Sequence, residues 1–426
     1  MPTSVAHLLL PIIVAVSILL MLVRPRGLPE VYWVGSGALL LIVLGLIPLS
    51  SAGHAVLEGM DVYLFLTGMM LVSELARDAG VFDWVATVAV RSARGSSTRL
   101  FTLIYGVGTV VTILMSNDAT AVVLTPAVLS AARKARADKP LPYLFACALI
   151  ANAASFVLPL SNPANLVVFR SGMPPLPHWL AAFTLPSLLS IAATYVVLRV
   201  YFRAELQAPV EGDCEATPLT LEGKLVLGGI FLLLVVLLAT STLGKDLGLP
   251  TCLTALVITA GVCLKSRTSP LKLVREISWA VLPLVAALFV LVEAVNGMGA
   301  LELTSEALHR AEQLPPALGA LVTGGVVAVA NNLVNNLPLG LIAGATLTST
   351  HTTGLIANAV LIGVDLGPNL SVTGSLATIL WLGALRREHI DVGFRDFLKL
   401  GALIMPLALL LALGGAILMR MLSVAH

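Results

Sequence analysis

Long stretches without charge constrain the fold of this chain more than any other feature. Residues 140–169 and 314–350 contain no Asp, Glu, Lys or Arg, and residues 100–132 contain only Asp118. Charged residues make up 11% of the chain, against about 25% in an average soluble domain. Apolar runs longer than about 18 residues are typical of helices that span a bilayer. We therefore predict an all-α polytopic membrane protein that is solvated by the lipid bilayer.

Ten apolar segments have the length of membrane spans, five in each half of the chain. They cover approximately residues 5–23, 30–50, 60–77, 140–170, 178–202, 222–243, 248–265, 277–298, 352–385 and 397–422. Two further apolar stretches, residues 99–132 and 315–350, are each interrupted near the middle by polar residues. About 14 residues follow each interruption and reach about 21 Å as a helix, which is short of the ~30 Å hydrocarbon core. We expect a re-entrant hairpin of two half-helices in each stretch.

The distribution of basic residues predicts the topology. If the N-terminus is periplasmic, all but four of the 25 Lys and Arg residues lie in cytoplasmic loops, the exceptions being Arg170, Lys245, Arg310 and Arg420. This asymmetry follows the positive-inside rule. It predicts a bacterial inner-membrane protein with both termini in the periplasm. Since each half has an odd number of spans, the second half is predicted to be inverted relative to the first.

Two inverted repeats and a linker account for the whole chain. The predicted segments are a first repeat at 1–203 with its hairpin at about 99–132 and a broken span at about 140–170, a polar cytoplasmic linker at 204–222, and a second repeat at 223–426 with its hairpin at about 315–350 and a broken span at about 352–385. A sequence echo supports this division, because Asn117 and Asn336 lie 219 positions apart, as do Glu74 and Glu293.

Four polar interruptions, one in each hairpin and one in each broken span, carry the functional signal. They are Ser116-Asn117-Asp118-Ala119-Thr120, Pro159-Leu160-Ser161-Asn162-Pro163-Ala164-Asn165, Asn331-Asn332-Leu333-Val334-Asn335-Asn336-Leu337-Pro338 and Asp365-Leu366-Gly367-Pro368-Asn369-Leu370-Ser371-Val372-Thr373-Gly374-Ser375. Irregular backbone at membrane depth is tolerated only where protein buries it or water reaches it. Paired breaks of this kind indicate the midplane site of a secondary transporter. The alternative is that Asn and Ser only hydrogen-bond helices together.

The polar side chains of these breaks are the candidate site. The predicted substrate-binding residues are Ser116, Asn117, Ser161, Asn162, Asn165, Asn335, Asn336, Asn369 and Thr373. Asp118 and Asp365 are each the only charged residue in a long apolar window, where a carboxylate costs about 2.5–3.5 kcal/mol and needs a function or a partner. We interpret both as carriers of a coupling proton. Capping of a half-helix is an equal alternative for Asp118, whereas function is favoured for Asp365.

Other classes of chemistry lack their motifs. The chain has no Walker loop, dinucleotide-binding turn or nucleophile elbow, so neither a bound nucleotide nor another cofactor is expected. No nucleic-acid partner is expected either. The seven histidines lie at predicted termini or loops, which disfavours an intramembrane enzyme. The four cysteines form no metal-ligand spacing and are interpreted as small core or loop residues: Cys147, Cys214, Cys252 and Cys263.

Several segments resemble the ArsB arsenite/antimonite efflux family, within the superfamily that also contains dicarboxylate and NhaD-type sodium/proton carriers. The most specific segment is Gly363-Val364-Asp365-Leu366-Gly367-Pro368, continuing to Gly374-Ser375-Leu376-Ala377-Thr378. Ser116-Asn117-Asp118 and Asn335-Asn336-Leu337-Pro338 also carry the resemblance, which covers essentially the whole chain. Dicarboxylate carriers use a Ser-Asn-Thr tip. A carboxylate at the third position, Asp118, would repel a dianion.

The resemblance implies secondary active efflux of trivalent arsenite or antimonite, as the neutral trihydroxide, in exchange for protons. It implies that the only metal or metalloid bound is this substrate, held by the polar breaks. A cytoplasmic arsenite-stimulated ATPase is a partner of some carriers in this family. Elevator-like motion of the bundle that carries the hairpin tips is also implied. A NhaD-type sodium/proton antiporter is the alternative, because it would use similar amides and carboxylates.

Overall fold

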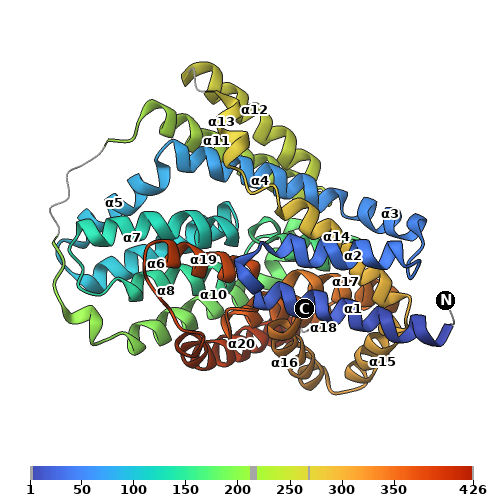
Figure 1. The fold of residues 1–426 in the computed structure, drawn as a ribbon. Coiled ribbons are helices and arrows are strands. Elements are labelled where there is room, and N and C mark those ends of the chain that lie inside the picture. The colour runs from blue at the N-terminus through green and yellow to red at the C-terminus, as the bar shows by residue number, and fades with distance from the viewer. Residues whose placement is uncertain (1–2, 212–217, 267–268, 425–426) are drawn as a thin grey trace.

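A computed structural model of the protein describes residues 3–211, 218–266 and 269–424 (Figure 1). All regular secondary structure in these residues is helical, apart from one isolated β-bridge between Ser96 and Pro209. The first half contains α1 (Thr3–Val23), α2 (Glu30–Val43), α3 (Leu49–Glu58), α4 (Met60–Asp78), α5 (Val81–Ala93), α6 (Ser97–Leu114), α7 (Thr125–Lys134), α8 (Leu141–Ala153), α9 (Pro163–Val168) and α10 (Leu176–Tyr201). The second half contains α11 (Leu221–Thr242), α12 (Gly248–Ser266), α13 (Pro270–Glu276), α14 (Val281–Asn296), α15 (Ala300–Glu312), α16 (Pro316–Val334), α17 (Asn336–Thr350), α18 (Leu355–Leu366), α19 (Leu376–Arg387) and α20 (Phe394–Val424).

The lengths and apolar composition of these helices confirm a multi-pass membrane protein. Six helices in the described part of the chain are long and apolar enough to cross a membrane: α6, α10, α11, α12, α16 and α20. The pairs α3–α4 and α13–α14 are also long and apolar enough to cross a membrane when each pair is taken as one bent span, with bends of 47° and 44° respectively. The six long helices and the two bent pairs carry many exposed large apolar side chains, mostly Leu and Val, which suits contact with lipid.

One predicted span is wrong at its C-terminal end. The segment 30–50 was expected to be a continuous helix, but α2 ends at Val43 and α3 begins at Leu49. Gly45 takes a left-handed conformation (φ 66°) between them, and Pro48 precedes the first residue of α3. Glycine adopts this conformation without steric cost, and proline favours a new start over continuation of a helix.

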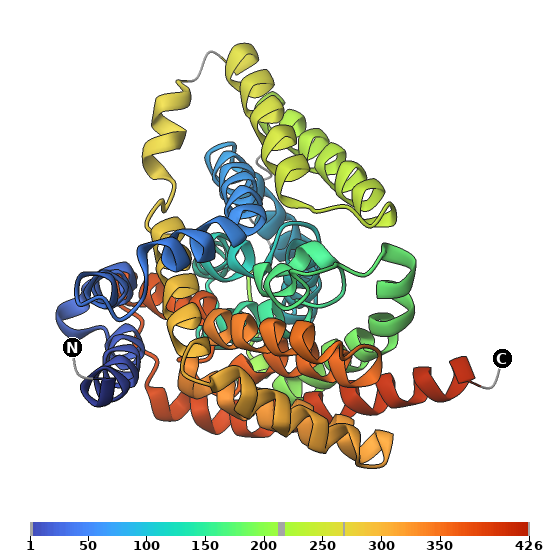
Figure 2. The same cartoon turned by 90° about the vertical axis from the view of Figure 1, so that its right-hand side faces the viewer.

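The order of elements repeats along the chain. Each half has two helices, a bent pair, a 13-residue helix (α5 or α15), an interrupted pair, a broken helix and a long final helix. The contacts between helices repeat as well. The contact of α2 with α14 has its equivalent in that of α12 with α4, and the contact of α9 with α17 has its equivalent in that of α19 with α7. The helices α10 and α20 pack against each other. Figure 2 shows the pairs α1–α2 (blue) and α11–α12 (yellow-green) on different sides of the molecule.

The interruptions lie near the predicted positions, with one correction. In the first hairpin α6 ends at Leu114, Ser116 has a φ of 152°, and the helix resumes as a π-helical segment, Ala119–Leu124, that leads into α7. In the second hairpin α16 continues through Asn331 and Asn332, which were predicted to break it, and the break falls at Asn335 (φ 82°). The amides of Asn331 and Asn332 instead donate to carbonyl groups, so the helix tolerates them.

The described part of the predicted linker lies along the open end of the first hairpin. Val210 N donates to Gly95 O at 3.1 Å, before α6, and Glu211 N donates to Ala135 O at 2.8 Å, after α7. The hydroxyl of Ser97 donates to Ala208 O. The linker therefore contacts both limbs of this hairpin. Residues 212–217, including Cys214, lie outside the described residues.

Candidate functional site

Side-chain hydrogen bonds join the unwound segments of the two broken helices. Asn162 Nδ2, which precedes α9, donates to Asp365 Oδ1 of α18 at 2.7 Å. Asn152 Nδ2 of α8 donates to Asn369 Oδ1 at 3.0 Å, and Asn369 Nδ2 donates to Leu149 O at 3.0 Å. Segments more than 200 residues apart thus form one polar layer. Asn152 was not predicted, although an Asn inside the charge-free α8 was a signal that could have identified it.

Several predicted residues of the first broken helix hold its backbone in place. Asn162 Oδ1 accepts from Ala164 N at 3.0 Å and so caps α9. The amide nitrogen of Asn165 lies 2.9 Å from Ser155 O and also within hydrogen-bonding distance of Leu158 O and Pro159 O. Ser161 Oγ donates to Ile113 O of α6 at 3.1 Å. These bonds satisfy backbone N–H and carbonyl groups that the loss of regular helix leaves free.

The tip of the second hairpin is bound to the unwound segment after α18. Asn335 Nδ2 donates to Thr373 O at 3.1 Å, and Asn336 N donates to Gly374 O at 2.9 Å. Ser371 Oγ donates to Asn332 Oδ1 at 2.7 Å, a contact that was not predicted. These hydrogen bonds hold the hairpin tip against the unwound segment.

The tip of the first hairpin leaves its carboxylate unpaired. Ser116 Oγ accepts from Ala119 N at 3.4 Å and takes the capping position. Asp118 lies in the first turn of the helix that follows, and its side chain makes no capping hydrogen bond. No described residue donates to its carboxylate. The capping role considered for Asp118 is therefore filled by Ser116, and the carboxylate faces a cavity.

This cavity, which we call the tip cavity, has a volume of about 550 Å³. One wall is formed by α4, α5 and the start of α14, and the other by the first hairpin tip, α7, Pro163 and α19. Its ionisable lining residues are Glu74, Arg77, Asp83, Asp118, Glu276, Arg387 and Glu388. Arg77 donates to both Glu74 and Glu276. Five carboxylates against two guanidinium groups give the cavity an acidic lining.

Several buried acceptors near the breaks have no hydrogen-bond donor among the described residues. They include Asn117 Oδ1, Asn336 Oδ1 and Asp365 Oδ2. Asn117 and Asn336 occupy equivalent positions at the two hairpin tips. A buried acceptor without a partner costs about 1–3 kcal/mol. A solute with several O–H donors would remove this cost.

The structure thus divides the predicted residues into two groups. Ser116 and Asp118 line the tip cavity, whereas Asp365 is fully buried and does not. Asn162 connects the two, because its neighbour Pro163 lines the cavity and its amide binds Asp365. Six of the remaining predicted residues are buried around the breaks and do not line the cavity: Asn117, Ser161, Asn165, Asn335, Asn336 and Asn369. Thr373 is half-buried, does not line the cavity either, and donates to Asn332 O at 2.9 Å.

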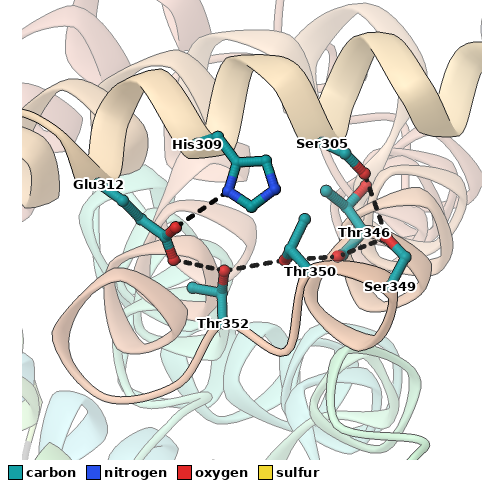
Figure 3. Close-up of polar contacts among 7 residues, drawn as sticks. All are labelled: Ser305, His309, Glu312, Thr346, Ser349, Thr350 and Thr352. Atoms are coloured by element: carbon teal, nitrogen blue, oxygen red, sulfur yellow. Dashed lines mark hydrogen bonds and ion pairs between the residues drawn. The ribbon is translucent and has the colours of Figure 1, made fainter.

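A second cavity of about 330 Å³ lies where α9 and α17 end, and is lined by Ser171, Thr348, His351 and Thr352 among others. A polar network beside it joins α15 to the end of α17 (Figure 3). Thr352 Oγ1 donates to Glu312 Oε1 at 2.6 Å, and Glu312 Oε2 lies 3.2 Å from His309 Nδ1. These contacts fix α15 to the second hairpin.

Comparisons with known proteins cover nearly the whole chain. The model of the citrate transporter family (CitMHS) matches residues 11–364. The chain is 26% identical over 424 residues to the arsenical pump membrane protein of Yersinia enterocolitica, covering 96% of this chain and 98% of that protein. It is 26% identical over 429 residues to the arsenical pump membrane protein of Escherichia coli K12, covering 96% and 98%, and 25% identical over 418 residues to a putative arsenical pump membrane protein of Bacillus subtilis 168, covering 92% and 94%.

A solved structure shares the fold. The Alcanivorax borkumensis YdaH transporter superposes with a TM-score of 0.54 at 16% sequence identity, and the match covers 87% of this chain and 86% of that chain. At this identity the similarity concerns the fold alone.

Proposed function

We infer the function from one premise: this chain belongs to the citrate transporter family, and it is a membrane transporter. We propose that it exports arsenite and antimonite, as neutral trihydroxides, across the bacterial inner membrane in exchange for protons. The arsenical pump membrane proteins of Yersinia enterocolitica and Escherichia coli support this substrate, since the similarity to them runs almost from end to end. Sodium/proton antiport is not favoured, because these relatives carry the name of an arsenical pump.

The acidic lining of the tip cavity argues against citrate as the substrate. Five carboxylates and two guanidinium groups line it, and Arg77 is already paired with Glu74 and Glu276. A citrate anion would need an excess of cationic donors, as carboxylate recognition usually relies on Arg. A neutral trihydroxide carries no charge to be repelled, and its O–H groups can donate to carboxylate and amide oxygens.

One observation carries the proposal: Asp118 lines the tip cavity, and no residue that the structure describes donates a hydrogen bond to its carboxylate. In the ionised form it accepts hydrogen bonds from the hydroxyl groups of the solute. In the protonated form it can accept fewer hydrogen bonds from the solute, and it carries no negative charge. Proton and solute therefore compete for one group, which is the requirement for exchange. Asp365, linked to the cavity through Asn162, is proposed as a second proton carrier.

The amides at the breaks have two proposed roles. Ser116 is proposed to bind the solute from the wall of the cavity. Asn117 and Asn336 lie outside this lining, but their acceptor oxygens have no donor among the described residues, and they are proposed to bind the solute when the hairpin tips move. The other predicted binding residues are proposed to contribute to the pocket and to hold the unwound backbone in place. Hydrogen bonds to backbone carbonyl groups support this role for Ser161, Asn165, Asn335, Asn369 and Thr373. Asn162 has the same proposed role, supported by its cap of α9 and its bond to Asp365.

We propose that residues 1–203 and 223–426 are inverted repeats, each with a re-entrant hairpin, and that both termini are periplasmic. The exchanged contacts of α2 with α14 and α12 with α4 support a two-fold relation between the halves. Alternating access would then move the hairpins and broken helices against the bent pairs. The proton gradient supplies the energy, so the proposal needs no ATPase subunit.

Solute uptake into inverted vesicles tests the substrate. With a pH gradient and without sodium, we expect accumulation of arsenite and antimonite but not of citrate. Citrate uptake, or a strict requirement for sodium, would contradict the proposal. The Asp138→Asn variant, in which an exposed loop carboxylate is lost, is the control for charge removal and should transport like the parent.

A further inference from the structure

An ion pair joins the first broken helix to the first bent pair. Arg170 Nη1 lies 3.0 Å from Glu58 Oε2. Arg170 follows α9, and Glu58 is the last residue of α3, the first limb of the bent pair. Their side chains are 25% and 39% exposed. The pair therefore bridges the two groups of helices that alternating access would separate. The second carboxylate oxygen of Glu58, Oε1, lies 3.5 Å from His54 Nδ1.

The second repeat has the same two groups in the same places. Glu276 is the last residue of α13, the first limb of the second bent pair, and Arg387 is the last residue of α19. Glu58 and Glu276 lie 218 positions apart, and Arg170 and Arg387 lie 217 apart, close to the offset of 219 between Asn117 and Asn336. An acid and an arginine thus recur together at equivalent element ends.

The second pair is not formed. Arg387 and Glu276 both line the tip cavity, Glu276 accepts instead from Arg77, and Arg387 has no ion-pair partner among the described residues. The first pair is closed, with Arg170 Nη1 at 3.0 Å from Glu58 Oε2. The two ends of the molecule are therefore in opposite states.

Each arginine is attached to the end of a hairpin. Beside Arg387, Glu388 Oε2 accepts from Arg133 Nη1 at the end of α7, at 2.6 Å. Beside Arg170, the hydroxyl of Ser171 bonds that of Thr348 near the end of α17. These contacts also occupy equivalent places in the two repeats. Each arginine is consequently expected to move with its hairpin, relative to the bent pair that carries the acid.

We propose that Arg170–Glu58 and Arg387–Glu276 are alternating gates on opposite sides of the membrane. This inference rests on the alternating access of the proposed function. In the state seen here Arg170–Glu58 holds one entrance closed while the tip cavity is open. On transition Arg387 replaces Arg77 as the partner of Glu276 and closes the tip cavity, while Arg170 leaves Glu58. Exchange of one arginine for another keeps Glu276 compensated, which avoids the cost of an unpaired charge in a closing interface.

A reporter in the tip cavity tests the gates. Ser73 lines this cavity on α4, so Ser73→Cys can be placed in a chain whose four native cysteines are replaced by serine. The probe is a membrane-impermeant maleimide added to inverted vesicles. Glu58→Gln or Arg170→Gln should slow labelling about two- to five-fold, as expected for a partly exposed ion pair, and Arg387→Gln should accelerate it by a similar factor. Combining Glu58→Arg with Arg170→Glu should restore the parent rate.

The matched control removes an ion pair within a single helix. Glu306 pairs with Arg310 four residues later in α15, and Glu306→Gln should leave labelling unchanged. If the two pairs are static, the variants should label at the same rate as this control, or the labelling rate should change in the same direction for both pairs. Either result would overturn the proposal.

Cross-linking gives a second measurement that does not depend on the reporter. A separate variant carries Arg387→Cys together with Glu276→Cys. Oxidation should join the two cysteines by a disulfide and stop arsenite transport, and a reductant should restore it. The labelling assay contains no arsenite, so it judges the gates separately from the substrate. If the protein transports arsenite but the gate variants label at the parent rate, the gates are overturned and the exchange proposal is left intact.

Discussion

The side-chain amide of Asn162 donates to the carboxylate of Asp365 at 2.7 Å, although 203 positions separate them in the sequence. Asn162 also caps α9 through its amide oxygen. One side chain therefore fixes the start of a half-helix in the first repeat and binds a buried carboxylate at the break in the second. With the bond between Asn152 and Asn369, it makes the two unwound segments a single polar layer.

Removal of this side chain should destabilise the protein more than its size suggests. Asn162→Ala takes away the cap of α9 and the donor to Asp365, and we expect a loss of about 2–4 kcal/mol from the two effects together. Thermal unfolding of the purified protein in detergent measures the change. Asn358→Ala, at a second-cavity residue for which no side-chain hydrogen bond is described, should have little effect. Equal stability of the two variants would refute this role of Asn162.

Close packing of the second unwound segment against α20 gives a steric prediction. A Cβ atom at Gly401 would lie 2.3 Å from Leu370 O and 2.4 Å from Asn369 O. Gly401→Ala must therefore displace backbone beside the site, and we expect a loss of about 1–3 kcal/mol together with weaker transport. Gly414→Ala on the same helix meets no atom within 4 Å and should be as stable as the parent or more so. Comparison of both melting temperatures and both uptake rates decides the point.

The network in Figure 3 predicts how strongly α15 is held to the second hairpin. Thr352→Val removes the hydroxyl that donates to Glu312 Oε1 at 2.6 Å. Because the acceptor is charged and partly exposed, we expect a loss of about 1 kcal/mol and faster proteolysis between α15 and α17. Thr353→Val changes a neighbouring exposed hydroxyl and serves as the control. Identical digestion patterns would show that the network does not hold α15.

The sequence alone predicted the positions of the helix breaks well, for a physical reason. Asn, Ser, Gly and Pro inside charge-free windows are costly in lipid, so they occur where the backbone is irregular. The break in the second hairpin lies at Asn335 and not at Asn331, because an Asn that donates to a neighbouring carbonyl can remain in a helix. No local pattern distinguishes these two cases.

The partners of the site residues could not be predicted in the same way. Asn162–Asp365, Asn152–Asn369 and Arg170–Glu58 each join residues more than 100 positions apart, and only the packing of the halves brings them together. The role of Asp118 depended on the backbone of its neighbour: the φ of 152° at Ser116 turns that hydroxyl toward the helix start. Sequence spacing contains no information about such a rotation.

Proton movement driven by arsenite in liposomes that contain only this protein tests the central claim most directly. For the parent and for Asp138→Asn, we predict that an arsenite gradient moves protons in the opposite direction, without sodium or ATP. Asp118→Asn keeps the size of the side chain and removes the titratable carboxylate from the tip cavity. We predict that it lowers this proton flux at least about a hundredfold, the lower end of what a positioned proton-transfer group contributes. Full proton exchange by a folded Asp118→Asn protein would contradict the account.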